Sequence, residues 1–192
     1  TKIWLTADSR LTYPTSFSGD KREVELEGEA YFEVQHDDQT PFFVKTSQST
    51  IRVYGTTFNV KAYPNDSFQK TTLESGSIGL FVDDKEYRLT PNEQAILNPS
   101  KDVKILKVDA RQQSVWRHGR FLFANERLED IMAQLGRWYD VNIFFIGTQA
   151  RELHFSGEID RYEKIDKVLS MIELTTNISF SINGKTITIT PE

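Results

Sequence analysis

The sequence has no cysteine, and its 192 residues include only three histidines, two methionines and six prolines. Without cysteine the chain cannot form disulfides, thiolate metal sites or a cysteine nucleophile. His36, His118 and His154 are not spaced as metal-ligand pairs, and no nucleophile elbow, phosphate-binding loop or glycine-rich dinucleotide turn is present. We therefore expect no catalytic residues, no metal ion and no cofactor, and we predict that the protein is not an enzyme.

Long apolar runs and an excess of positive charge are also missing. No run approaches the ~18–20 apolar residues that cross a bilayer, and 23 basic against 28 acidic residues give a net charge of -5. This balance argues against a nucleic-acid partner, because such binding depends on neutralising phosphates with Lys and Arg. The chain begins with Thr1 and carries no signal peptide, so we expect a piece of a longer protein whose targeting or anchoring segment lies outside it.

The first 112 residues consist of short segments in which apolar and polar residues alternate, separated by turn residues such as Gly19-Asp20 and Asn98-Pro99. This pattern is typical of half-buried strands and predicts an all-β domain, either a sandwich or a β-helix-like stack. Segments that begin at Leu26, Val53 and Leu73 share an apolar–glycine–apolar skeleton. This irregular repeat favours the stack.

From residue 113 the period of the apolar residues changes to that of helices. Apolar stripes over residues 128–139 and 165–172 predict two amphipathic helices that begin 37 residues apart. The strand-like segments beside them repeat at the same offset, and Asn183-Gly184 indicates a final hairpin. Asn125 and Asp160 are expected to cap the two helices.

The predicted fold class is therefore mainly β plus α+β. Residues 1–112 are expected to form an N-terminal all-β domain, β-helix-like or sandwich. Residues 113–192 are expected to form a small duplicated β-α-β domain with a C-terminal hairpin.

One strand segment carries four acidic residues at a spacing of two, Glu23, Glu25, Glu27 and Glu29. That spacing places four carboxylates on one face of a strand. Paired carboxylates can hydrolyse glycosides, and a carboxylate cluster can bind calcium, so the alternative function is a carbohydrate-binding or carbohydrate-active β protein. The other interpretation, which we favour, is a solvated face that keeps the strand from pairing with foreign edges.

A set of motifs distributed over nearly the whole chain resembles those of the FecR family. In the family's order and approximate spacing they are residues 9–14 (SRLTYP), 17–19 (FSG), 28–34 (GEAYFEV), 41–44 (PFFV), 55–63 (GTTFNVKAY) and 91–95 (PNEQA). Residues 116–123 (WRHGRFLF) and 156–159 (SGEI) resemble the small domain that follows FecR regions. That domain is similar to the secretin and TonB short N-terminal domain, which implies an STN-like unit over residues 113–192.

The resemblance implies the periplasmic sensor region of a FecR-like transmembrane anti-sigma factor, anchored to the inner membrane in the full-length protein. It implies two protein partners. One is the signalling domain of a TonB-dependent outer-membrane transporter, and the other is an extracytoplasmic-function sigma factor, bound through a cytoplasmic region outside this chain. A relay of this kind needs binding surfaces and no catalytic groups.

The terminal segment, residues 186–190 (TITIT), is the strand that we predict to bind a partner. It has no charge and no proline before Pro191, so it lacks the usual protection against pairing with a foreign strand. We expect Ile187 and Ile189 to face the core, and Thr186, Thr188 and Thr190 to lie on an open edge that adds the partner's strand. In the other interpretation the strand lies inside its sheet, where threonine only satisfies β propensity.

Overall fold

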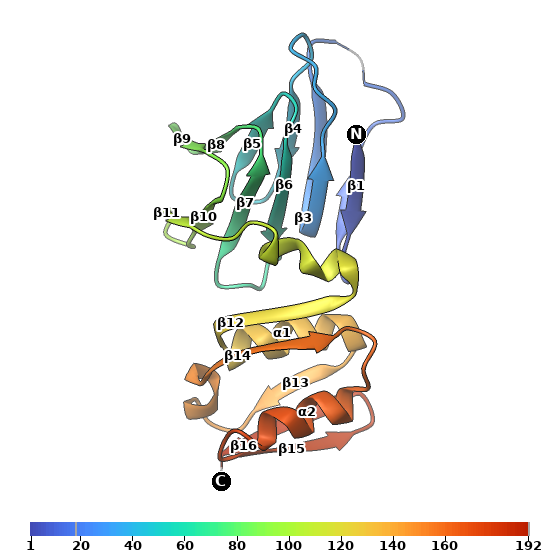
Figure 1. Cartoon of the computed structure of the whole chain (residues 1–192), viewed down its shortest axis with the longest axis vertical. Coiled ribbons are helices and arrows are strands. Elements are labelled where there is room, and N and C mark those ends of the chain that lie inside the picture. The colour runs from blue at the N-terminus through green and yellow to red at the C-terminus, as the bar shows by residue number, and fades with distance from the viewer. Residues whose placement is uncertain (18, 192) are drawn as a thin grey trace. The chain divides into compact units, whose positions relative to one another are not determined.

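The computed structural model describes residues 1–17 and 19–191, and it divides into two compact units, Thr1–Arg117 and His118–Glu192 (Figure 1). Each unit has its own cluster of buried apolar side chains. The chain is mainly β, as predicted. The division falls after Arg117 and not after Gln112, because Arg117 is bound to the first unit: its guanidinium lies 3.5 Å from the ring centroid of Tyr31. That the two units fold independently stays a prediction.

The first unit contains strands and one short 3-10 helix. In chain order they are β1 (Lys2–Leu5), β2 (Arg10–Thr12), β3 (Arg22–Glu33), β4 (Phe42–Lys45), β5 (Thr50–Val53), β6 (Thr57–Ala62), β7 (Gln69–Ser75), β8 (Ile78–Val82), β9 (Lys85–Leu89), β10 (Glu93–Leu97), β11 (Val103–Lys107) and η1 (Gln112–His118).

The long strand β3 organises the sheet of this unit. The strands follow the order β11-β10-β7-β6-β3-β4-β5-β8-β9, with β1 and β2 also paired to β3. The first half of β3 pairs with β2 and β4, and its second half pairs with β1 and β6, so one strand belongs to both halves of the sheet. Among the described strands of this unit only β3 and β4 pair in parallel. This antiparallel pattern is that of a folded sheet, whereas successive turns of a β-helix-like stack would pair in parallel.

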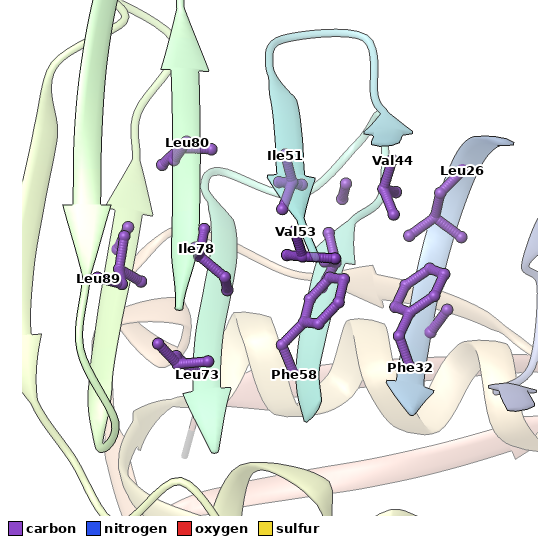
Figure 2. Close-up of a cluster of buried hydrophobic side chains, with 14 of the residues drawn as sticks. Leu26, Phe32, Val44, Ile51, Val53, Phe58, Leu73, Ile78, Leu80 and Leu89 are labelled. Atoms are coloured by element: carbon purple, nitrogen blue, oxygen red, sulfur yellow. The ribbon is translucent and has the colours of Figure 1, made fainter. Parts of the chain in front are cut away.

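The core of the first unit draws side chains from both halves of the sheet. Figure 2 shows Leu26, Val44 and Ile51 from one half in the same cluster as Phe32 and Phe58 from the other. The rings of Phe32 and Phe58 stack with their centroids 4.9 Å apart. Alternating apolar residues on each strand thus supply one continuous core.

The second unit combines short strands with two helices. In chain order they are β12 (Arg120–Arg127), α1 (Leu128–Tyr139), β13 (Asn142–Phe145), η2 (Gln149–Glu152), β14 (His154–Asp160), α2 (Ile165–Glu173), β15 (Ile178–Asn183) and β16 (Thr186–Pro191). Strands β12 and β14 form an antiparallel pair, and a separate three-stranded sheet has the order β13-β16-β15. The predicted helices and hairpin are confirmed.

Both helices bury the predicted apolar stripes. Leu128, Ile131, Met132 and Leu135 of α1 are buried, as are Val168, Leu169 and Ile172 of α2. Together with apolar residues of β12, β15 and β16 they form one cluster. Amphipathic helices are held in this way mainly by packing and not by helix propensity alone.

The two predicted helix caps are wrong. Asn125 has a φ of 51° and lies in an irregularity of β12 where the pairing with β14 shifts register. The residue at the N-cap position of α1 is Arg127, which makes no side-chain capping hydrogen bond. Asp160 accepts a hydrogen bond from the backbone N–H of Tyr162, in a turn that precedes Lys164 at the start of α2.

Candidate partner-binding surface

The expected open edge at β16 is wrong, because β16 is the central strand of its sheet. It pairs in parallel with β13, from Thr186 to Ile189, and antiparallel with β15 along its whole length. Both rows of backbone groups are therefore used inside the sheet. A foreign strand cannot add to β16 without displacing a neighbour.

The side chains of β16 otherwise face as predicted. Ile187 and Ile189 are fully buried in the core of the unit, and Thr186, Thr188 and Thr190 are partly exposed on the other face. That these three threonines contact a partner stays a prediction. The sequence pattern identified the two faces of the strand correctly but contained no signal for which strands lie beside it.

The true edges of this sheet are β13 and β15. On β15 the backbone N–H of Phe180 donates a hydrogen bond to Glu173 Oε1 at 2.7 Å, so the end of α2 covers part of that edge. On β13 the side chains of Phe144 and the following Ile146 are 60% and 55% exposed. Phe144 lies on the exposed face of this uncharged strand, and Ile146 follows the strand two residues later, so the two side chains form an exposed apolar surface.

The four glutamates of β3 lie in a row on the face opposite the core, as predicted, but not all of them are exposed to solvent. Glu25 and Glu27 are exposed, but Glu29 is only 6% exposed and accepts a hydrogen bond from Asn59 Nδ2 at 2.8 Å. The alternation of the strand continues past Gly28, because Leu26, Ala30 and Phe32 all belong to one core cluster. Glu29 therefore shares the face of Glu25 and Glu27, but that face is covered at its far end, where Tyr31 is also buried. The sequence pattern shows which residues share a face and contains no signal for what covers it.

The first carboxylate of that row is neutralised by two lysines. Glu23 forms ion pairs with Lys21 at 2.8 Å and with Lys45 at 2.9 Å. Hydrogen bonds from these two ammonium groups hold the pKa of Glu23 below its ordinary value. Glu23 is therefore ionised at neutral pH and is a poor general acid, which weakens the case for glycoside hydrolysis.

The histidines are scattered. His36 lies 3.2 Å from Asp38 in an exposed turn, and His154 Nδ1 lies 2.8 Å from the carbonyl oxygen of Glu152. Within residues 1–17 and 19–191, no group of three or more histidine or acidic side chains could hold a metal ion. The described surface thus offers strand edges and apolar side chains, which suit protein binding.

Comparisons with known proteins found a matching family model in each unit. The family model described as "FecR protein" matches residues 1–79, and the model described as "FecR, C-terminal" matches residues 120–189. No curated protein matches the chain.

Two crystal structures of a "putative anti-sigma factor" from Parabacteroides distasonis ATCC 8503 match the chain over both units. The structure at 1.65 Å resolution has a TM-score of 0.92 and 30% sequence identity, and the match covers 99% of this chain and 90% of that one. The structure at 2.50 Å resolution has a TM-score of 0.91 and 30% identity, with 99% and 89% covered. The chain belongs to the FecR family.

The helices of both units are short. None of those within the described residues is long and apolar enough to cross a membrane.

Proposed function

We propose that this chain is the periplasmic sensor region of a FecR-like transmembrane anti-sigma factor, with no enzymatic activity of its own. In this function it receives a signal from the signalling domain of a TonB-dependent outer-membrane transporter. It relays that signal to an extracytoplasmic-function sigma factor, which a cytoplasmic region outside this chain would hold.

The observation that carries the proposal is the match to the "putative anti-sigma factor" over 99% of the chain at 30% identity. The two FecR family models support it, because they match one unit each. The surface supports it as well, since exposed strand edges serve protein recognition.

An STN-like second unit is part of the proposal. Helices α1 and α2 begin at Leu128 and Ile165, which are 37 residues apart in the sequence, and each helix is followed by a strand of the same sheet. A duplicated β-α-β arrangement, as in the secretin and TonB short N-terminal domain, would have this order of elements.

The test measures binding of this chain to purified signalling domains of TonB-dependent transporters from the same bacterium. Isothermal titration calorimetry should show saturable binding to at least one of them. The matched control is the double variant Glu25→Gln/Glu27→Gln, which should bind that domain equally well, because its substitutions lie on the exposed acidic face of β3. Absence of binding to every such domain would refute the proposal. Binding of an oligosaccharide by the wild type, lost in the double variant, would favour the carbohydrate alternative.

A further inference from the structure

We propose that β13 is the strand through which the transporter's signalling domain binds, by adding an uncharged extended segment of its own to the open edge of the β13-β16-β15 sheet. This inference rests on the proposed function. It names β13 in place of the expected β16, and Phe144 and Ile146 in place of the three threonines. The edge is open because no side chain of the preceding helix covers it.

The pairing of β13 leaves alternate backbone groups without a partner strand. The N–H of Asn142 donates to the carbonyl oxygen of Lys185, and the N–H of Ile146 donates to that of Ile189. In a parallel ladder, the backbone N–H and C=O groups of every second residue point toward the neighbouring strand. The N–H and C=O groups of Ile143 and Phe145 therefore point away from β16, and no hydrogen bond to either N–H is found among the described residues.

The other edge of the same sheet is protected, and the sequence shows why β13 is not. Glu173 covers the N–H of Phe180 on β15. At the offset of 37 residues, Phe180 corresponds to Ile143, and Glu173 corresponds to Gly136 in the last turn of α1. Gly136 has no side chain, and an added Cβ would lie only 3.1 Å from Ile143 Cγ1. The helix thus packs closely on β13 but cannot cap it.

Apart from β13 and β15, every edge strand among the described residues carries charge, which is a common protection against foreign strands. The charged residues are Lys2 on β1, Arg10 on β2, Lys85, Glu86 and Arg88 on β9, Lys104 and Lys107 on β11, Arg120, Glu126 and Arg127 on β12, and Glu158 and Asp160 on β14. Strand β13 has neither charge nor a cap. It is the edge most suited to accept a strand.

The size of the surface decides between a second copy of the chain and a different partner. A stable dimer buries about 1,200–2,000 Å² in total. Full burial of Phe144 and Ile146 from two copies falls well below this range, because an aromatic residue buries only about 150–250 Å². Short-lived signalling contacts function with less area than a stable dimer, so this small surface fits a transient partner such as the signalling domain. Its docking segment should place apolar side chains against Phe144 and Ile146 and carry no charge there.

The experiment compares two edges of one sheet. The double variant Phe144→Lys/Ile146→Lys places charge on β13 at exposed positions, and the control Ile182→Lys does so on β15, where Ile182 is 48% exposed. Circular dichroism should show native folding of both. Titration with the signalling domain that binds the wild type should show at least tenfold weaker binding by the double variant and less than a twofold change for Ile182→Lys.

Amide hydrogen exchange tests the backbone directly. In the complex, exchange of the Ile143 and Phe145 N–H groups should slow at least tenfold, since strand addition would hydrogen-bond both. Wild-type affinity in the double variant, equal weakening by Ile182→Lys, or unchanged exchange would overturn the inference while the proposed function stands. Slower exchange with rising concentration of the chain alone would identify a second copy as the occupant and also overturn it. If the wild type binds no signalling domain, both proposals fail.

Discussion

At the scale of single residues, burial separates side chains that look alike in the sequence. Leu135 lies in the buried stripe of α1, whereas Leu174 at the end of α2 is 85% exposed. Leu135→Ala should lower the free energy of unfolding by about 2–5 kcal/mol, because it removes buried methyl groups and leaves a cavity.

Leu174→Ala is the matched control and should change the free energy of unfolding by less than about 0.5 kcal/mol. Urea unfolding monitored by circular dichroism measures both. Equal effects of the two substitutions would mean that α1 is not packed on the core as described.

The glutamates of β3 give a second comparison. Glu29 is buried and accepts the hydrogen bond of Asn59, while Glu27 is exposed. Glu29→Ala should destabilise the chain by about 1–3 kcal/mol, because the buried amide of Asn59 loses its acceptor. Glu27→Ala should cost less than about 0.5 kcal/mol in the same urea titration. A larger loss for Glu27 than for Glu29 would contradict the burial of Glu29 described above.

Glu93 predicts how stability depends on pH. Its carboxylate accepts a hydrogen bond from the N–H of Thr90 at 2.7 Å and pairs with Lys107 at 3.0 Å, and the two interactions lower its pKa. A lowered pKa in the folded state adds stability above the unfolded value of about 4.3, and this stability is lost as the pH falls through the folded pKa. Urea midpoints measured from about pH 6 downward should fall less steeply in Glu93→Gln than in the wild type. Parallel curves would show that Glu93 does not contribute.

At the scale of elements, β3 depends on a glycine at the point where it passes from one half of the sheet to the other. Gly28 has a φ of 105°, and a Cβ there would lie 2.7 Å from Ser9 Cα. Gly28→Ala should therefore destabilise the first unit by about 1–3 kcal/mol. Gly157→Ala on β14 is the control, since no atom lies within 4 Å of a Cβ there, and it should be neutral or slightly stabilising. Thermal unfolding of the two variants tests this, and similar midpoints would argue against strain at Gly28.

The sequence pattern predicts which side chains face the core, but it does not predict the order of the strands in a sheet. A period of two or of 3.6 shows which side chains face the core, so the strands, the helices and the burial of Ile187 and Ile189 were predictable. The pattern does not report lateral neighbours, because both edges of a strand use identical backbone groups. For this reason β16 was expected at an edge and lies in the centre, and the uncapped β13 was missed.

At the scale of the whole molecule, the two buried clusters share no residue. Two cores of this kind should unfold in separable steps if each unit is a domain. Differential scanning calorimetry of Leu135→Ala should then show one component with a lower midpoint temperature. The expected decrease is about 4–8 °C for each kcal/mol of lost stability, the value for a unit of fewer than 100 residues. The second component should keep its wild-type midpoint. A single transition that shifts as a whole would show that the units unfold together.

The arrangement of the second unit also bears on how many partners the proposed strand addition could accommodate. Strands β12 and β14 pair antiparallel, and β13 and β15 run antiparallel on either side of β16, so the segments that contain them are related by an approximate two-fold axis. A symmetric pair of this kind would present two equivalent edges. Strand β16 has no counterpart in the other half and lies between β13 and β15. The two edges also differ, because Glu173 covers an N–H of β15 while Gly136, at the corresponding position, has no side chain to cover β13. If β13 is the docking strand, as proposed, the broken symmetry implies a stoichiometry of one partner per chain.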